Sequence, residues 1–276
     1  MRAITDGDPL LIAHRGFAGE NPENTVRAVE AAAGSGGADW VEIDVSPTAD
    51  GDPVVCHDAA LSGRGGPLGT PADRGLTDTA GLVWETDTAT VTDAEVLDSG
   101  ETVPLLATLL DAVPEHVGVN IELKFPEGGP VGDHAGGTLD PDALAARRAA
   151  WRPFVERVLG TAEARDGDLL VSSFHEGALA ATREVSNVSV APLFSEAVSD
   201  GLELARRYDA AAVHPPIDAV RGTPFFDASR FGDADVVAAA HDAGRAVNVW
   251  TVETWYEAAR LESAGVDGVI ADYSVG

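Results

Sequence analysis

Charged side chains alternate with apolar ones in two stretches of the sequence. Glu42 and Asp44 lie two residues apart in one stretch, and Glu122 and Lys124 lie two residues apart in the other. Because neighbouring side chains of a β-strand point to opposite faces, each pair is expected on one side of its strand, with the apolar residues on the other.

Three carboxylates on adjacent strands repel one another unless a positive charge lies between them. The simplest candidate is one hard divalent cation, Mg²⁺ or Ca²⁺, which binds carboxylate oxygens and water. Zinc is less favoured because no cysteine lies near these residues. A second interpretation is an ionic network in which Arg15 and Lys124 neutralise the carboxylates, although desolvating such a network is costly.

Two histidines, His14 and His57, end predicted strands on either side of this acidic cluster. A pair of imidazoles at one site can serve as general base and general acid. We interpret the neighbouring Asp58 as a turn residue. Glu23 and Asn24 are interpreted as capping residues of the first helix, with Asn24 at its N-cap.

The distribution of basic residues singles out Lys124. The chain has 276 residues, of which 18 are basic and 46 acidic, and Lys124 is its only lysine. Lysine differs from arginine in carrying a compact point charge, which suits contact with an anion. The pattern therefore indicates an anion-binding role for this side chain.

Composition excludes several classes of protein. Hydrophobic residues form 45% of the chain, which argues against disorder, and the net charge of −28 argues against nucleic acid as a partner. With one cysteine, Cys56, no internal disulfide framework is possible. No apolar run is long enough for a membrane span and no signal peptide is evident, so we expect a cytoplasmic protein without a stable membrane anchor. The acid-rich, lysine-poor composition leads to the hypothesis of a halophilic protein.

Strand-like apolar runs alternate with helical periodicity along the chain. Eight main strands are predicted, at residues 10–13, 38–45, 117–125, 169–174, 188–194, 210–214, 246–252 and 268–271. Helices are predicted between them, at residues 24–33, 105–112, 139–164, 177–184, 197–208, 233–243 and 254–264, and Pro153 should break or kink the third of these. This alternation predicts an α/β fold, a TIM (β/α)8 barrel forming one domain over residues 1–276.

Three deviations from an ideal barrel are expected. Asp50-Gly51 predicts a small β-hairpin after the second strand, with residues 54–56 returning as a short strand. Residues 59–103 are predicted to form an irregular loop region on the barrel. The last helix should be truncated or missing, so that another segment or a second subunit of a homo-oligomer would cover the last strand. A doubly wound open sheet is disfavoured because no GxGxxG motif follows the first strand.

Taken in order, these motifs resemble the glycerophosphodiester phosphodiesterase family. The matching segments are His14-Arg15-Gly16, Pro22-Glu23-Asn24-Thr25, Gly37-Ala38-Asp39 with Glu42 and Asp44, Thr48 through Asp50-Gly51, His57-Asp58, Ile121-Glu122-Leu123-Lys124, Val249-Trp250-Thr251-Val252 and Gly265-Val266-Asp267-Gly268. The chain differs from the family pattern at Ser62-Gly63-Arg64-Gly65-Gly66 and at Ala271-Asp272-Tyr273-Ser274.

The resemblance implies a metal-dependent phosphodiesterase that converts glycerophosphodiesters to glycerol 3-phosphate and an alcohol. The roles that it implies are one divalent cation held by Glu42, Asp44 and Glu122, general acid–base catalysis by His14 and His57, phosphate binding by Arg15 and Lys124, and a glycerol pocket lined by Trp250. The partner is then a small-molecule phosphodiester. Whether water or the substrate's glycerol hydroxyl attacks first stays open.

Two alternatives are retained. The first is lysophospholipase D-like activity on a lipid with an acyl chain, against which the negative surface and the lack of an amphipathic membrane helix argue. The second is a catalytically silent barrel that binds a phosphorylated ligand. A mere binder has little need of paired proton carriers, so the two histidines argue against this alternative.

Overall fold

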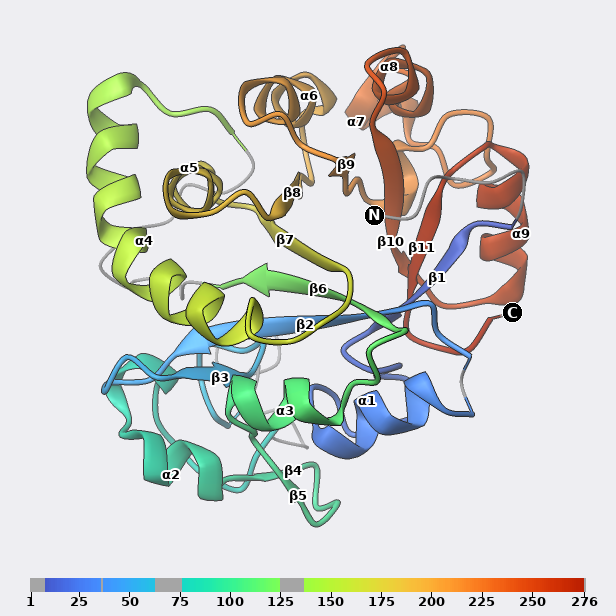
Figure 1. The fold of residues 1–276 in the computed structure, drawn as a ribbon. Coiled ribbons are helices and arrows are strands. Elements are labelled where there is room, and N and C mark those ends of the chain that lie inside the picture. The colour runs from blue at the N-terminus through green and yellow to red at the C-terminus, as the bar shows by residue number, and fades with distance from the viewer. Residues whose placement is uncertain (1–7, 36, 63–75, 125–136, 276) are drawn as a thin grey trace.

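The computed structural model describes residues 8–35, 37–62, 76–124 and 137–275. Its main sheet contains eight parallel strands in the order β8-β7-β6-β2-β1-β11-β10-β9 (Figure 1). A parallel bridge between Leu193 and His214 joins the two ends of this order, so the sheet is a nearly closed barrel. The strands are β1 (Leu10–His14), β2 (Trp40–Pro47), β6 (Gly118–Leu123), β7 (Leu169–Ser173), β8 (Ser189–Pro192), β9 (Ala212–Val213), β10 (Ala246–Val252) and β11 (Gly268–Ala271). The predicted (β/α)8 architecture is confirmed.

Helices connect the strands and cover the outside of the barrel (Figure 1). They are α1 (Val26–Ala33), α3 (Leu106–Ala112), α4 (Pro141–Ala162), α5 (Glu176–Val185), α6 (Val198–Arg207), α7 (Ala228–Phe231), α8 (Val236–Asp242) and α9 (Trp255–Ser263). On α4 the buried residues Trp151, Phe154, Val155 and Val158 recur at helical spacing and face the core. The helix bends but continues through Pro153, so of the two predicted outcomes, a break or a kink, the break does not occur.

Strand periodicity divides the side chains between two cores. On β2, Val41, Ile43 and Val45 belong to the large core between strands and helices, whereas Trp40 belongs to a smaller core inside the barrel. The smaller core comprises Ile12, Trp40, Leu170, Ala191, Ala212, Ala246 and Ile270. The even-numbered side chains of β2 therefore point into the barrel, as the two-residue spacing predicted.

The register between β2 and β6 aligns these inward residues. Trp40 lies opposite Gly118, and Asp44 lies opposite Glu122. A Cβ atom on Gly118 would lie 2.3 Å from the Trp40 ring, so glycine makes room for the indole. The same pairing brings two carboxylates together at the carboxyl end of the strands.

Residues 76–103 hold more structure than the predicted irregular loop. They contain a 3₁₀ turn (Val83–Glu85), α2 (Thr88–Asp93) and the strand pair β4 (Glu95–Val96) and β5 (Glu101–Thr102). Together with β3 (Pro53–Val55), which runs antiparallel to β2, these elements enclose a separate core of Val54, Cys56, Leu61, Val83, Val91, Ala94, Val96 and Val103. The glycine-rich positions Gly63, Gly65 and Gly66 lie outside the described residues, as does Phe125 at the predicted end of the third strand.

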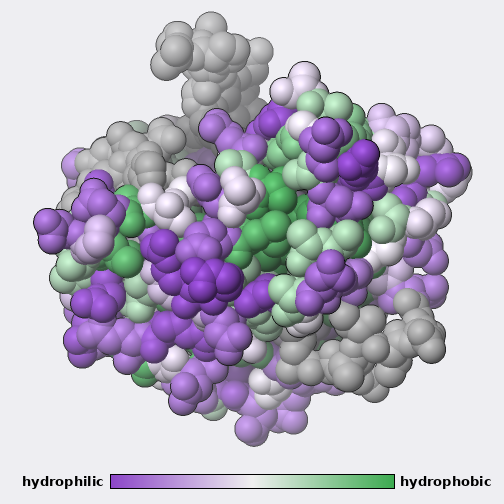
Figure 2. Space-filling model, turned by 90° about the horizontal axis from the view of Figure 1, so that it is seen from above, coloured by the Kyte–Doolittle hydropathy of each residue, from purple (hydrophilic) through white to green (hydrophobic). Residues whose placement is uncertain are grey.

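Hydrophilic residues cover most of the face seen in Figure 2, and hydrophobic residues gather towards its middle. This distribution fits the net charge of −28. Among the described helices, none combines the length and the apolar character that crossing a membrane requires. The described residues after β11 hold no helix and lie against the loop between β1 and α1, where Gly19 N donates to Asp272 O at 2.9 Å.

Candidate active site

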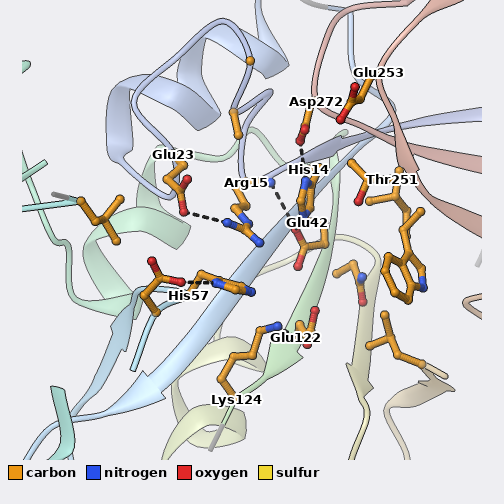
Figure 3. Close-up of a pocket in the computed structure, with 18 of the residues that line it drawn as sticks. His14, Arg15, Glu23, Glu42, His57, Glu122, Lys124, Thr251, Glu253 and Asp272 are labelled. Carbon is orange, nitrogen blue, oxygen red and sulfur yellow. Dashed lines mark hydrogen bonds and ion pairs between the residues drawn. The ribbon is translucent and has the colours of Figure 1, made fainter. Parts of the chain in front are cut away.

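Seven of the eight predicted site residues line one pocket of about 740 Å³, at the carboxyl ends of the barrel strands. These seven are His14, Arg15, Glu42, His57, Glu122, Lys124 and Trp250. Figure 3 labels the first six of them. The eighth, Asp44, is fully buried and contacts Arg15 and Lys124. In (β/α)8 enzymes this end of the barrel carries the active site.

The acidic residues converge as expected. One ligand atom from each of Glu42, Asp44 and Glu122 lies within 4.8 Å of the others, and all three side chains are buried. The Oε1 atom of Glu42 has no hydrogen-bond partner among the described residues. A buried carboxylate oxygen without a donor is costly, and a cation would satisfy it. The three residues can therefore hold a hard divalent cation.

Two cationic side chains contact this cluster. Lys124 Nζ lies 2.5 Å from Glu122 Oε1 and 3.2 Å from Asp44 Oδ1. Arg15 Nε lies 3.1 Å from Asp44 Oδ2. Part of the alternative ionic network is thus present, but its two cations pair with only two of the three carboxylates, Asp44 and Glu122. Among the described residues, no lysine or arginine side chain lies within salt-bridge distance of Glu42.

The pKa values of Glu42 and Asp44 move in opposite directions. Burial raises the pKa of Glu42 well above its usual value, and the neighbouring Asp44 and Glu122 carboxylates raise it further. Burial would also raise the pKa of Asp44, but the Lys124 and Arg15 cations outweigh it and hold that pKa well below its usual range. The surroundings thus favour the ionised form of Asp44 and disfavour the ionised form of Glu42, which a nearby cation would favour.

Each predicted catalytic histidine faces a carboxylate. His14 Nδ1 lies 2.5 Å from Asp272 Oδ1 (Figure 3), and His57 Nδ1 lies 2.7 Å from Asp58 Oδ1. An ionised carboxylate can only accept a hydrogen bond, so each Nδ1 is the donor and Nε2 is the nitrogen that can accept a proton. Asp58, interpreted from sequence as a turn residue, therefore also contacts His57.

The expected helix cap is wrong at Asn24. Thr25 is the N-cap of α1, and its Oγ1 accepts from Ala28 N at 3.2 Å. Asn24 instead has a φ of 57°, donates from Nδ2 to Asp44 Oδ2 at 3.0 Å and accepts from Asp44 N at 3.2 Å. Asn24 thus orients the Asp44 side chain and does not cap α1.

The preceding residue, Glu23, likewise faces the site. Its Oε1 accepts from Arg15 Nη1 at 2.8 Å. Burial alone would lower the pKa of Arg15, but the Asp44 and Glu23 carboxylates raise it above its usual value. The guanidinium is therefore held between two carboxylates and stays charged.

Aromatic residues form another wall of the pocket. Trp250 Nε1 donates to the carbonyl oxygen of His214 at 2.8 Å, and the Trp250 ring meets Phe174 edge-on with centroids 5.6 Å apart. His214 itself is buried, and burial lowers its pKa to about 3. The indole is thus fixed in orientation while remaining partly open to the pocket.

Sequence reasoning assigned no site role to Asn24, Glu23 or Asp272. Glu23 and Asn24 lie next to the Thr25 cap, where capping was the simpler interpretation. Asp272 directly follows β11, and the rule that active-site residues follow barrel strands would have found it.

Comparisons with known proteins match nearly the whole chain. The family model described as "Glycerophosphoryl diester phosphodiesterase family" matches residues 14–275. A glycerophosphodiester phosphodiesterase from Bacillus altitudinis is 28% identical over 267 residues, covering 95% of this chain and 94% of that protein. A lysophospholipase D from Rattus norvegicus is 33% identical over 113 residues, 41% of this chain and 35% of that protein. The structure of an Oleispira antarctica phosphodiesterase, in complex with the product sn-glycerol-3-phosphate, has a TM-score of 0.72 and 29% identity and covers 97% of this chain and 94% of that chain.

Proposed function

The chain belongs to the glycerophosphoryl diester phosphodiesterase family, whose members are phosphoric diester hydrolases, and from this premise we propose that it converts glycerophosphodiesters to glycerol 3-phosphate and an alcohol with one divalent cation. The observation that carries the proposal is the buried trio Glu42, Asp44 and Glu122, with Lys124 against it and a histidine on either flank. The Oleispira antarctica relative, bound to sn-glycerol-3-phosphate, supports the same product here.

Glu42, Asp44 and Glu122 would hold the cation. Their oxygen donors suit Mg²⁺ or Ca²⁺, which prefer carboxylates and water. When bound, the cation supplies positive charge that polarises a phosphoryl oxygen. Positive charge at this position would favour the ionised form of Glu42, whose pKa is raised by burial.

Arg15 and Lys124 would bind the phosphate group. Burial alone would lower the pKa of Lys124, but the Glu122 and Asp44 carboxylates raise it above its usual value. Both cations line the pocket and are held by ion pairs, so they are placed before substrate arrives. Fixed positive groups of this kind neutralise the charge that grows on the phosphoryl oxygens in the transition state.

His14 and His57 would carry the protons. Nε2 of one imidazole accepts the proton of the attacking hydroxyl, and the other imidazole protonates the departing alcohol oxygen as its bond to phosphorus breaks. The attacking group is water, or the substrate's own glycerol hydroxyl in a first step that water completes. Trp250 would line the glycerol side of the pocket.

The test is a direct assay of the purified protein. Glycerophosphocholine is incubated in molar KCl, with and without EDTA, and glycerol 3-phosphate is measured. We expect product that EDTA abolishes and that excess Mg²⁺ or Ca²⁺ restores. Product that survives metal removal would contradict the metal assignment.

A second candidate is hydrolysis of lysophospholipids, favoured by the apolar side chains of Leu76 and Leu97 in the pocket wall. The same assay is repeated with lysophosphatidylcholine. The substrate with the higher kcat/KM then decides between the two candidate functions. Absence of product from either substrate would instead favour a barrel that only binds phosphorylated ligands.

A further inference from the structure

The two histidines of the pocket are held in different ways. His57 contacts the residue next to it, whereas His14 contacts Asp272, which is 258 positions away in the sequence. The His14 ring has Nδ1 2.5 Å from Asp272 Oδ1 and Nε2 4.0 Å from Glu42 Oε2. Its orientation therefore depends on where the far end of the chain lies.

That end of the chain is fastened to the loop after β1 by a short segment, Asp272 to Ser274, which we name the C-terminal strap. Asp272 O accepts from Gly19 N at 2.9 Å, and Asp272 N donates to Val252 O at 2.9 Å. Ser274 donates from its backbone N at 2.6 Å and from Oγ at 2.8 Å, both to Glu20 Oε1.

The strap also packs closely on the loop. A Cβ atom on Gly19 would lie 2.3 Å from the Tyr273 ring, so the absence of a side chain at Gly19 allows the ring to rest there. Asp272 is therefore fixed through its own backbone and through the two residues after it. A carboxylate held in this way can hold an imidazole in turn.

The carboxylate also determines which nitrogen of His14 carries the proton. Ionised Asp272 can only accept, so the neutral imidazole keeps its proton on Nδ1 and turns the lone pair of Nε2 towards the acidic cluster. An imidazole that acts as a base through Nε2 needs this tautomer.

We propose that Asp272 is a positioning residue for His14, and that the C-terminal strap holds it in place. The inference rests on the proposed function, in which His14 carries a proton. In this proposal Asp272 acts only by orienting His14 and does not itself contact the substrate.

The test compares two aspartates that flank the same strand. Asp272 follows β11 and contacts His14, whereas Asp267 precedes β11 and contacts His241 with an Nε2 to Oδ2 distance of 2.8 Å. Asp272→Asn and Asp267→Asn remove the same charge from a histidine contact, but only the first lies in the pocket. In the metal-loaded protein we expect Asp272→Asn to lower kcat on the order of 10²-fold with KM within about threefold, and Asp267→Asn to leave kcat within about threefold.

A spectroscopic measurement separates positioning from general damage. In ¹⁵N-histidine spectra, assigned with His14→Gln, His14 should carry its proton on Nδ1 in the wild type. The side-chain amide introduced by Asp272→Asn can donate to Nδ1, so in this variant the proton of the imidazole should move to Nε2. This shift is expected even if no diester is hydrolysed, which distinguishes failure of this inference from failure of the proposed function.

The strap is tested at Glu20, because Asp272 variants could fold poorly. Glu20→Ala removes the acceptor of both Ser274 hydrogen bonds, whereas Glu20→Gln keeps a carbonyl oxygen there. We expect kcat to fall about tenfold in Glu20→Ala and to recover in Glu20→Gln. The inference is overturned if Asp272→Asn keeps wild-type kcat, if it raises KM alone, if it leaves the His14 tautomer unchanged, or if both Glu20 variants behave like the wild type.

Discussion

The barrel interior has two regions of opposite character, built from the same strands. We call the charged end the mouth, consisting of His14, Arg15, Glu42, Asp44, His57, Glu122 and Lys124, and the apolar end the lower interior, consisting of Ile12, Trp40, Gly118, Leu170, Ala246 and Ile270. On β2 they are two residues apart, Trp40 in one and Glu42 in the other. Buried charges are costly to desolvate, whereas close apolar packing stabilises the fold. The contrast indicates that the mouth serves chemistry and the lower interior serves stability.

The largest expected effect is the loss of a metal ligand. Glu122→Gln keeps the shape of the side chain but removes the charge that would help to hold the cation. We expect activity to fall by at least about 10³-fold, because the charge stabilisation of several kcal/mol that the proposed cation would supply is lost. Glycerol 3-phosphate release at fixed metal, with metal affinity from calorimetry, measures this effect.

The free energy of unfolding without metal should change little, because the substitution relieves repulsion among three buried carboxylates but also removes the ion pair between Glu122 and Lys124, which keeps its contact with Asp44. The distinction between the two regions would be contradicted if Glu122→Gln lowered activity and also lowered the free energy of unfolding by about 2 kcal/mol, the loss typical of overpacking in a core.

The next effect concerns the proton carriers. His57→Ala should lower kcat by at least about 10²-fold while the protein stays folded, because general acid–base catalysis contributes about that much. His241→Ala is the matched control, since His241 also contacts an aspartate but lies outside the pocket. Near-normal turnover by His57→Ala would remove that residue from the proposed mechanism.

Sequence reasoning was most successful where a local pattern determines the result. The alternation Val41, Glu42, Ile43, Asp44, Val45 predicted that the two acidic side chains share one face of the strand and the apolar ones the other, because strand geometry depends only on neighbouring residues.

It failed where a contact depends on a loop conformation or on distant segments. The role of Asn24 follows from a left-handed backbone at that residue, and the role of Asp272 from a contact with His14 across almost the whole chain. The part that residues 76–103 contribute to the separate small core was also missed, because its apolar residues, such as Val83, Val91 and Val96, follow neither helical nor strand spacing.

The lower interior is probed by adding one methyl group. Gly118→Ala places a Cβ atom 2.3 Å from the Trp40 ring, and overpacking of this kind should lower the free energy of unfolding by about 2 kcal/mol. Activity per folded molecule should stay near that of the wild type, in contrast to the mouth variants. Denaturant unfolding and a turnover assay on the same samples measure both quantities.

A second glycine supplies the control. Gly160 is an exposed residue of α4 with nothing within 4 Å of an added Cβ, so Gly160→Ala should stabilise the protein by about 0.5 to 1 kcal/mol. Equal responses at the two glycines would contradict the tight packing of Trp40.

The last effect, which vanishes at neutral pH, is a pH dependence of stability from His214, a buried histidine inside the barrel. Burial lowers its pKa from 6.5 to about 3. Between these values the unfolded chain binds a proton that the folded chain does not, so the free energy of unfolding falls as pH falls below 6.5, by at most about 1.4 kcal/mol per pH unit. His214→Gln removes this proton, and its stability relative to the wild type should therefore improve steadily from pH 6.5 to pH 4. Ser172→Ala, a buried substitution without a titrating group, should differ from the wild type by the same amount at each pH. Suppose instead that the difference in the free energy of unfolding between His214→Gln and the wild type did not change with pH. His214 would then bind a proton in the folded protein as readily as in the unfolded chain, and polar groups around it would have to stabilise its charge inside the barrel.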